Sequence, residues 1–129
     1  MIVIDSSVFV AIATLEPDAD ALSEAMARAG RCVMSAGNYL ECAMIAESRF
    51  GGRTALDAWI RRRGIDILPV DHGLARIAAD AFARFGKGRH PAGLNFGDCF
   101  AYALARTLGA PLLYKGGDFA RTDIAPALA

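Results

Sequence analysis

The opening stretch restricts the fold more than any other, because a short apolar run ends abruptly in a carboxylate. Ile2, Val3 and Ile4 form a continuous β-branched run, which is typical of a strand buried on both faces. Asp5 follows directly, and a carboxylate there costs free energy unless a hydrogen bond, an opposite charge or a metal compensates it. Ligands bind beyond the carboxyl ends of strands in open parallel sheets. Asp5 is therefore either the N-cap of the next helix or a ligand or catalytic acid.

Length and composition indicate one folded domain over residues 1–129. The chain is 54% hydrophobic, which argues against disorder. Its formal net charge is zero, so it does not coat nucleic acid through net charge alone, although a local basic rim remains compatible. The start lacks the features of a signal peptide, and no apolar run approaches the roughly 20 residues of a membrane span. We therefore expect a cytoplasmic protein without a membrane partner.

Strand-like and helix-like segments alternate along the chain. This order predicts an α/β fold with three layers, α/β/α, around a mostly parallel central sheet. We expect strands at residues 2–4, 32–34, 65–70 and 111–114, with a short edge strand at 122–125. We expect helices at residues 8–15, 18–29 and 36–49, two more that begin near residues 54 and 71, and one in the stretch 94–108 with Asn95 as its N-cap.

Side chains at three expected helix starts match capping patterns. Thr54 and Asp57 have the spacing of a capping box, and Asp71 has the place of an N-cap. Asn95 with Asp98 three residues later matches a capping box again. Asp98 is therefore either only part of a helix cap or also an acid of a functional site.

Four acids are expected at one edge of the sheet. Asp5 and Asp118 follow strand ends, Glu41 lies in the first two turns of a helix after a strand, and Asp98 opens a buried helix. Each has an ordinary interpretation as a cap or a dipole-favoured acid, but four together require protonation or a shared cation. Ligands that are all oxygen select Mg²⁺ or Mn²⁺, which can hold a phosphodiester and activate a water.

Four stretches resemble the PIN-domain ribonucleases, and in particular the VapC toxins of type II VapBC toxin–antitoxin systems. The resemblance covers essentially the whole chain. It lies in Ile4-Asp5-Ser6-Ser7, in Tyr39-Leu40-Glu41, in Leu94-Asn95-Phe96-Gly97-Asp98-Cys99, and in Lys115-Gly116-Gly117-Asp118-Phe119 with Thr122-Asp123. The third and fourth stretches are the most distinctive.

The resemblance implies an endoribonuclease that depends on Mg²⁺ or Mn²⁺ and cuts cellular RNA, often transfer or ribosomal RNA. By motif position, Asp5 and Asp98 are the metal ligands, Glu41 and Asp118 complete the catalytic acids, and Ser7 orients the site. The resemblance also implies a homodimer and a VapB-type antitoxin that inserts a chain segment at the acids. The sequence departs from the family at Gly117, where another polar or acidic residue is common.

The remaining candidates concern substrate and partner contacts. Residues 86–93 are either an exposed loop or a mobile basic flap beside the site. An apolar set is either ordinary core or a groove for an antitoxin helix: Val8, Phe9, Met44, Ile45, Leu56, Trp59 and Ile60. The candidates for binding substrate or orienting the site, besides Ser7, are Asn38, Lys87, Arg89, Lys115 and Arg121.

Two alternatives to a metal-dependent ribonuclease remain open from the sequence. One is a PIN-like module that binds RNA or protein without catalysis, which the neutral net charge allows. The other is a dehalogenase-type phosphatase with Asp5 as the nucleophile. That class usually needs a second Asp two residues further on, where this chain has Ser7.

Overall fold

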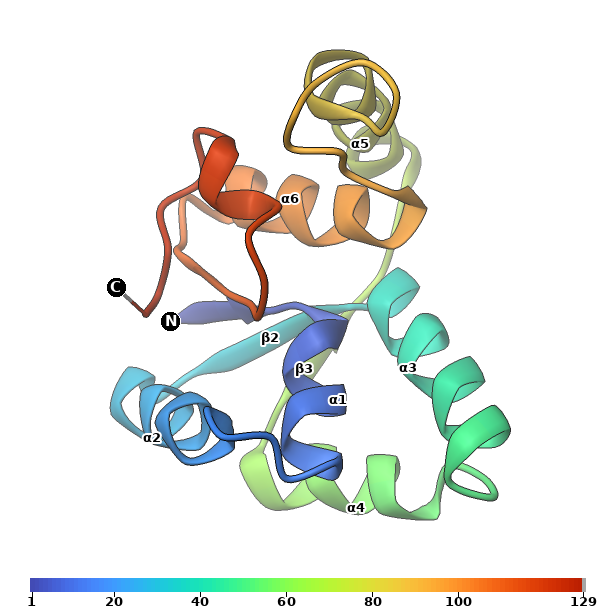
Figure 1. The fold of residues 1–129 in the computed structure, drawn as a ribbon, viewed down its shortest axis with the longest axis vertical. Helices are drawn as coiled ribbons and strands as arrows, with labels where there is room; N and C mark the ends of the chain where they lie inside the picture. The colour runs from blue at the N-terminus through green and yellow to red at the C-terminus, as the bar shows by residue number, and fades with distance from the viewer. Residues whose placement is uncertain (129) are drawn as a thin grey trace.

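A single parallel sheet organises the chain in the computed structural model, which describes residues 1–128 (Figure 1). The strand order is β3-β2-β1-β4, and every neighbouring pair is parallel. The strands are β1 (Ile2–Ile4), β2 (Cys32–Ser35), β3 (Asp66–Leu68) and β4 (Leu112–Leu113). The expected α/β class with a parallel sheet is therefore confirmed.

Helices cover both faces of the sheet and make the three expected layers (Figure 1). On one face lie α5 (His72–Phe85) and α6 (Phe96–Leu108). On the other lie α1 (Ser6–Ala13), α2 (Ala19–Ala29), α3 (Ala36–Arg49) and α4 (Thr54–Arg63). Within residues 1–128, no helix is long and apolar enough to cross a membrane.

The central strand β1 sends alternate side chains into two separate cores. Val3 packs into the cluster under α5 and α6, whereas Ile2 and Ile4 pack into the cluster under α1 to α4. This alternation follows from the period of two along a strand. All three residues of β1 are buried. Asp5 comes directly after them and is therefore buried as well.

Two local expectations were wrong. Thr54 does not cap α4: the N-cap is Arg53, which makes no side-chain cap bond, and Asp57 instead accepts a 2.7 Å hydrogen bond from the Tyr39 hydroxyl. Residues 122–125 do not form a strand. A short 3₁₀ helix, η1 (Phe119–Arg121), precedes them, and the chain meets the sheet through an isolated bridge between Leu112 and Pro126.

A glycine in the second position of α3 lets α3 and α6 approach closely. A Cβ atom on Gly37 would lie 2.7–2.8 Å from ring carbons of Phe100 in the first turns of α6. Gly73 holds the same second position in α5, and its Cβ atom would make only an ordinary 3.4 Å contact with Asp71. Gly37 thus brings together the helix starts that carry Glu41 and Asp98.

We predict that Gly37→Ala lowers the free energy of unfolding by about 1–3 kcal/mol, the usual cost of overpacking. The loss should appear although alanine favours a helix by about 1 kcal/mol over glycine. Gly73→Ala is the matched control and should leave stability unchanged or slightly raised. Urea unfolding of both variants tests this, and equal midpoints for the two would contradict the close approach of α3 and α6.

Candidate active site

The four candidate acids are placed by three strands and two helix starts. Asp5 follows β1, and Asp118 follows β4 after a glycine-rich turn. Glu41 lies in the second turn of α3, which begins where β2 ends, and Asp98 lies in the first turn of α6. Asp98 and Glu41 both raise the pKa of Asp5 by their charges, and Asp118 and Glu41 raise that of Asp98. The structure therefore brings the four side chains within electrostatic reach of one another.

Asp5 is buried, with 3% of its surface exposed, and only one of its oxygens is satisfied. Oδ2 accepts a 3.0 Å hydrogen bond from the Ser7 backbone N–H and so caps α1. Oδ1 is buried without a hydrogen-bond partner in the described chain. Burial raises the pKa of Asp5 to about 7, although the bonds from Ser7 oppose this shift. Asp5 is thus a cap through one oxygen and a free acceptor through the other.

Glu41 is held from two sides. The Ser6 hydroxyl makes a short hydrogen bond to Glu41 Oε1, and Asn38 Nδ2 donates to the same oxygen at 3.3 Å. Asn38 is fully buried, and its Nδ2 also donates to the Gly97 carbonyl at 2.9 Å. Asn38 therefore links the acid on α3 to the first turn of α6, which supports its expected role in orienting the site.

Sequence reasoning missed Ser6 and Gly97 as site residues. A Cβ atom on Gly97 would collide with the Glu41 carboxylate, so the glycine makes the space that this carboxylate occupies. The available signal was a glycine in the second position of a helix, directly before a candidate acid. Ser6 carried no such signal, because its partner is 35 residues away along the chain.

Asp98 combines the expected capping box with a perturbed acidity. Its Oδ2 accepts from the Asn95 N–H at 3.0 Å, and Asn95 Oδ1 accepts from the Asp98 N–H at 2.9 Å. Burial raises the pKa of Asp98 to about 6, the bond from Asn95 lowers it, and the charges of Asp118 and Glu41 raise it further. Asp98 Oδ1 takes no part in the capping box, so it is available as a ligand. A cation bound there would offset the cost of ionising Asp98.

Ser7 and Lys115 join the loop after β4 to the start of α1. Ser7 Oγ accepts a 3.0 Å hydrogen bond from the Lys115 backbone N–H. The Lys115 ammonium group forms a close ion pair with Glu16 and a 3.0 Å pair with Asp18. The side chain of Lys115 therefore already has two acidic partners within the protein.

The other basic candidates lie on and beside the loop at residues 86–93. Backbone bonds close this loop at its base, since Lys87 donates to Leu94 at 2.9 Å. Lys87, Arg89 and Arg121 are exposed. Arg89 lies 5.7 Å from the centre of the Phe82 ring, and Arg121 donates to the Pro91 carbonyl at 3.2 Å. The loop and η1 thus present their cations on adjoining segments.

Most of the apolar groove expected for a partner helix is ordinary core. Val8, Phe9, Leu56 and Trp59 are buried. Met44 is 62% exposed and lines a hollow of about 440 Å³, with Glu41 at its edge. The other lining residues are Gly37, Leu40, Ile45, Asn95, Phe96, Gly97 and Phe100. The accessible apolar surface therefore lies between α3 and the start of α6.

The acids have the ligand chemistry that a hard cation prefers, but they do not surround a preformed metal site. Among residues 1–128, no three His, Cys, Asp or Glu side chains form a ready metal-binding group. The donors at the site are all oxygens, and Asp5 Oδ1 is a buried acceptor without a partner in the described chain. Burial is the main cause of the raised pKa values of Asp5 and Asp98, and repulsion from the neighbouring acids adds to it. A divalent cation would offset both costs of ionisation.

Comparisons with known proteins agree with this architecture. Residues 2–125 match the PIN domain family. The chain is 51% identical over 125 residues to Ribonuclease VapC of Mycolicibacterium smegmatis, covering 95% of this chain and 97% of that protein.

Two solved structures share the fold. VapC20 of Mycobacterium tuberculosis, described as a sarcin–ricin loop cleaving toxin, superposes with a TM-score of 0.74 at 18% identity and covers 97% of both chains. A chain of a toxin–antitoxin complex from Klebsiella pneumoniae gives a TM-score of 0.72 at 14% identity and covers 95% of this chain and 93% of that one. With the family match and the 51% identical relative, the chain belongs to the PIN-domain family, as a VapC ribonuclease toxin of a toxin–antitoxin system.

Proposed function

We propose that this single-domain ribonuclease hydrolyses RNA phosphodiester bonds with Mg²⁺ or Mn²⁺ bound by Asp5 and Asp98. The observation that supports this most directly is the buried Asp5 oxygen that lacks a partner in the described chain, next to two further acids. A divalent cation there would bind the phosphate and lower the pKa of a water molecule. Phosphodiester hydrolysis requires both a bound phosphate and an activated water, and carboxylates alone supply neither.

The chain's own residues supply orientation and proton transfer. Glu41 is fixed by Ser6 and Asn38, so one of its oxygens is held while the other remains able to accept a proton from water. Ser7 holds the loop after β4 through the Lys115 N–H, and this loop carries Asp118. In this proposal Asp118 is the fourth acid, exposed at the rim of the site.

The substrate is an RNA whose phosphates contact Lys87, Arg89 and Arg121. These cations are exposed on two adjoining segments. Lys115 is a weaker candidate, because binding phosphate would require it to leave Glu16 and Asp18. Transfer or ribosomal RNA remains the proposed class, and the ribosomal alternative is supported by the description of VapC20 as a sarcin–ricin loop cleaving toxin.

A VapB-type antitoxin is the proposed partner, and a cationic segment of it would compensate the same acids. The Klebsiella pneumoniae toxin–antitoxin complex, which shares the fold, supports such a pairing. We further propose a homodimer. Exposed apolar side chains line two hollows that share Phe96 and Phe100, and contiguous exposed apolar surface is typical of protein interfaces. These side chains are Leu40, Met44, Phe82 and Phe96.

We predict that cleavage requires a divalent cation together with Asp5 and Asp98. Treatment with EDTA should abolish cleavage of structured RNA, and added Mn²⁺ should restore it. Asp5→Asn and Asp98→Asn should each lower the rate by about 100-fold or more, as expected when acid–base and metal-binding groups are lost. Cleavage that persists in EDTA, or in both variants, would contradict the metal mechanism. No cleavage of any RNA with Mn²⁺ present would instead favour a binding module without catalysis.

We predict that the metal-free protein loses stability as the pH rises. Folded Asp5, with a pKa of about 7, binds its proton more tightly than unfolded Asp5, with a pKa of 3.8. Folding therefore takes up protons between about pH 4 and about pH 7, and the free energy of unfolding falls through this window. The shift corresponds to a loss of the order of 4 kcal/mol.

Thermal melts in EDTA test this prediction. The melting temperature should be higher at about pH 5.5 than at about pH 8, and Asp5→Asn should flatten the difference. At the higher pH, millimolar Mg²⁺ should raise the melting temperature of the wild type but raise that of Asp98→Asn much less. Identical pH dependence in the wild type and Asp5→Asn would show that Asp5 is not the titrating group.

We predict that Gly97→Ala impairs activity more than stability. The added methyl group must displace the end of a flexible Glu41 side chain rather than backbone, so the fold can adjust while the carboxylate moves. A displacement of about 1 Å can cost up to 100-fold in rate, so we expect at least a tenfold loss. Gly73→Ala is the control. A Gly97→Ala protein that cleaves at the wild-type rate would show that the position of Glu41 does not matter.

A further inference from the structure

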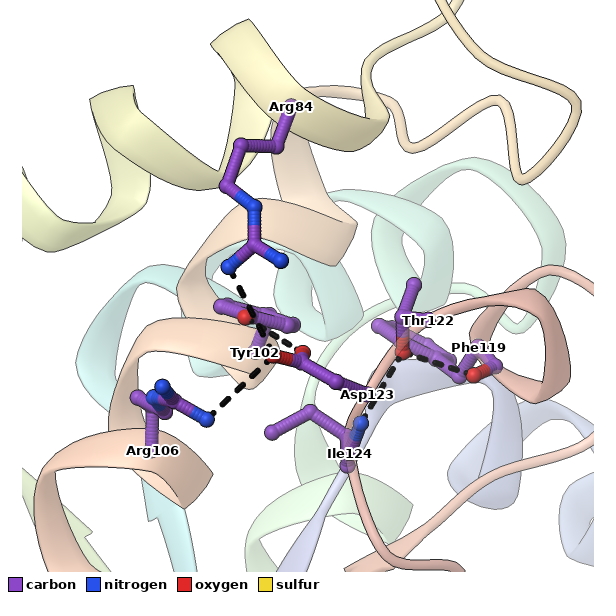
Figure 2. A network of polar contacts seen from close by, with 7 residues as sticks. All are labelled: Arg84, Tyr102, Arg106, Phe119, Thr122, Asp123 and Ile124. Atoms are coloured by element: carbon purple, nitrogen blue, oxygen red, sulfur yellow. Dashed lines mark hydrogen bonds and ion pairs between the residues drawn. The ribbon is translucent and has the colours of Figure 1, made fainter.

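Asp123 is the centre of a polar cluster outside the acid site, shown in Figure 2. Its Oδ1 accepts a 2.6 Å hydrogen bond from the Tyr102 hydroxyl, and its Oδ2 pairs with Arg106 at 3.3 Å and with Arg84 at 3.5 Å. Arg84 comes from α5, whereas Tyr102 and Arg106 come from α6 (Figure 2). We call these four residues the Asp123 clasp. It fastens the segment after β4 to both helices of one face.

The strength of the clasp lies mainly in the Tyr102 bond. The three charged side chains are each more than a third exposed, so their ion pairs contribute little to stability. Tyr102 is buried, with its ring in the core under α5 and α6 and its hydroxyl reaching Asp123. A charge-assisted bond of this length is short and directional.

The segment that the clasp fastens carries Asp118. Phe119 is buried directly after this acid, and its carbonyl accepts a 2.7 Å bond from the Thr122 hydroxyl (Figure 2). The Thr122 oxygen also accepts from the Ile124 N–H at 3.3 Å. Asp118 is therefore joined to Asp123 by one compact turn whose internal hydrogen bonds keep its shape.

Upstream of Asp118, the nearest anchored residue is Lys115, which is held through its N–H and its ammonium group. Gly116 and Gly117 separate Asp118 from Lys115, and Gly116 has a φ of 104°, a conformation that requires glycine. Asp118 is exposed and makes no side-chain capping bond to η1. Because two glycines restrict the backbone little, the position of Asp118 depends mainly on how the turn after it is held.

We propose that Asp123 is a positioning residue: through Tyr102 and the arginines of α5 and α6, it holds Asp118 at the rim of the acid site. The inference rests on the proposed role of Asp118 as the fourth acid. The Asp123 side chain does not reach the acids itself and would act on the site only through Asp118. A purely structural tie would affect stability alone, whereas a positioning residue must affect the reaction through Asp118.

The experiment uses Tyr102→Phe, which removes one hydroxyl and keeps the ring in the core. Hydrogen exchange at residues 116–122 should become faster. Single-turnover cleavage of RNA with Mn²⁺ should show a rate lowered about tenfold with KM changed less than about twofold. Asp123→Asn is a second variant of the same clasp and should act in the same direction.

Tyr39→Phe is the matched control. It removes a hydrogen bond of the same kind, from Tyr39 to Asp57 at 2.7 Å, which joins α3 to α4 instead. Exchange at residues 116–122 and the cleavage rate should both stay at wild-type values in this variant. A rate loss as large as that of Tyr102→Phe would mean that any Tyr–Asp tie affects catalysis, and would overturn the proposal.

The decisive comparison is a double-mutant cycle with Asp118→Asn. If the clasp acts through Asp118, Tyr102→Phe should lower the rate no further in the Asp118→Asn background. An equal fractional loss in both backgrounds, or faster exchange with an unchanged rate, would overturn the positioning role. Wild-type cleavage by Asp118→Asn would instead show that the fourth acid is wrongly assigned and remove the proposal with it. Failure of the metal mechanism would appear separately, as activity retained in Asp5→Asn and Asp98→Asn.

Discussion

The burial of the Asp5 carboxylate at the end of β1 is the constraint on which the site depends. β1 is the strand between β2 and β4, and its three residues are buried, so the chain leaves it inside the protein. One Asp5 oxygen satisfies the start of α1, and the other has no partner in residues 1–128. A buried, unpaired acceptor costs free energy that a cation can offset. In the metal-free state, the unpaired Asp5 oxygen therefore lowers the stability of the fold at the place where a cation would bind.

The sequence predicted the parts of the fold that depend on local signals. A buried β-branched run marked β1, and α3 was expected at residues 36–49, as found. The cap of α5 by Asp71 and the capping box of α6 are both present, because an N-cap acts over two or three residues. The convergence of acids followed from one rule, that parallel strands end at the same edge. Their proximity could thus be predicted from the order of the elements alone.

Contacts between distant segments were not predictable from local signals. Thr54 looked like a cap, but Arg53 took that position, and Asp57 found its partner in Tyr39 on the neighbouring helix. The pairing of Lys115 with Glu16 and Asp18 joins residues that are far apart in the sequence, so no local signal pointed to it. The roles of the glycines in the second positions of α3 and α6 depend on what faces them, which is Phe100 in one case and Glu41 in the other.

The central claim is that Asp5 and Asp98 share a divalent cation, and anomalous diffraction from crystals soaked in Mn²⁺ tests it most directly. We expect an anomalous peak within coordination distance of one oxygen of Asp5 and one of Asp98, at about 2 Å for a small hard ion. The same peak should be absent from crystals of Asp98→Asn. A manganese peak at another group of residues, or none at the acids in well-ordered wild-type crystals, would show that Asp5 and Asp98 do not share an ion.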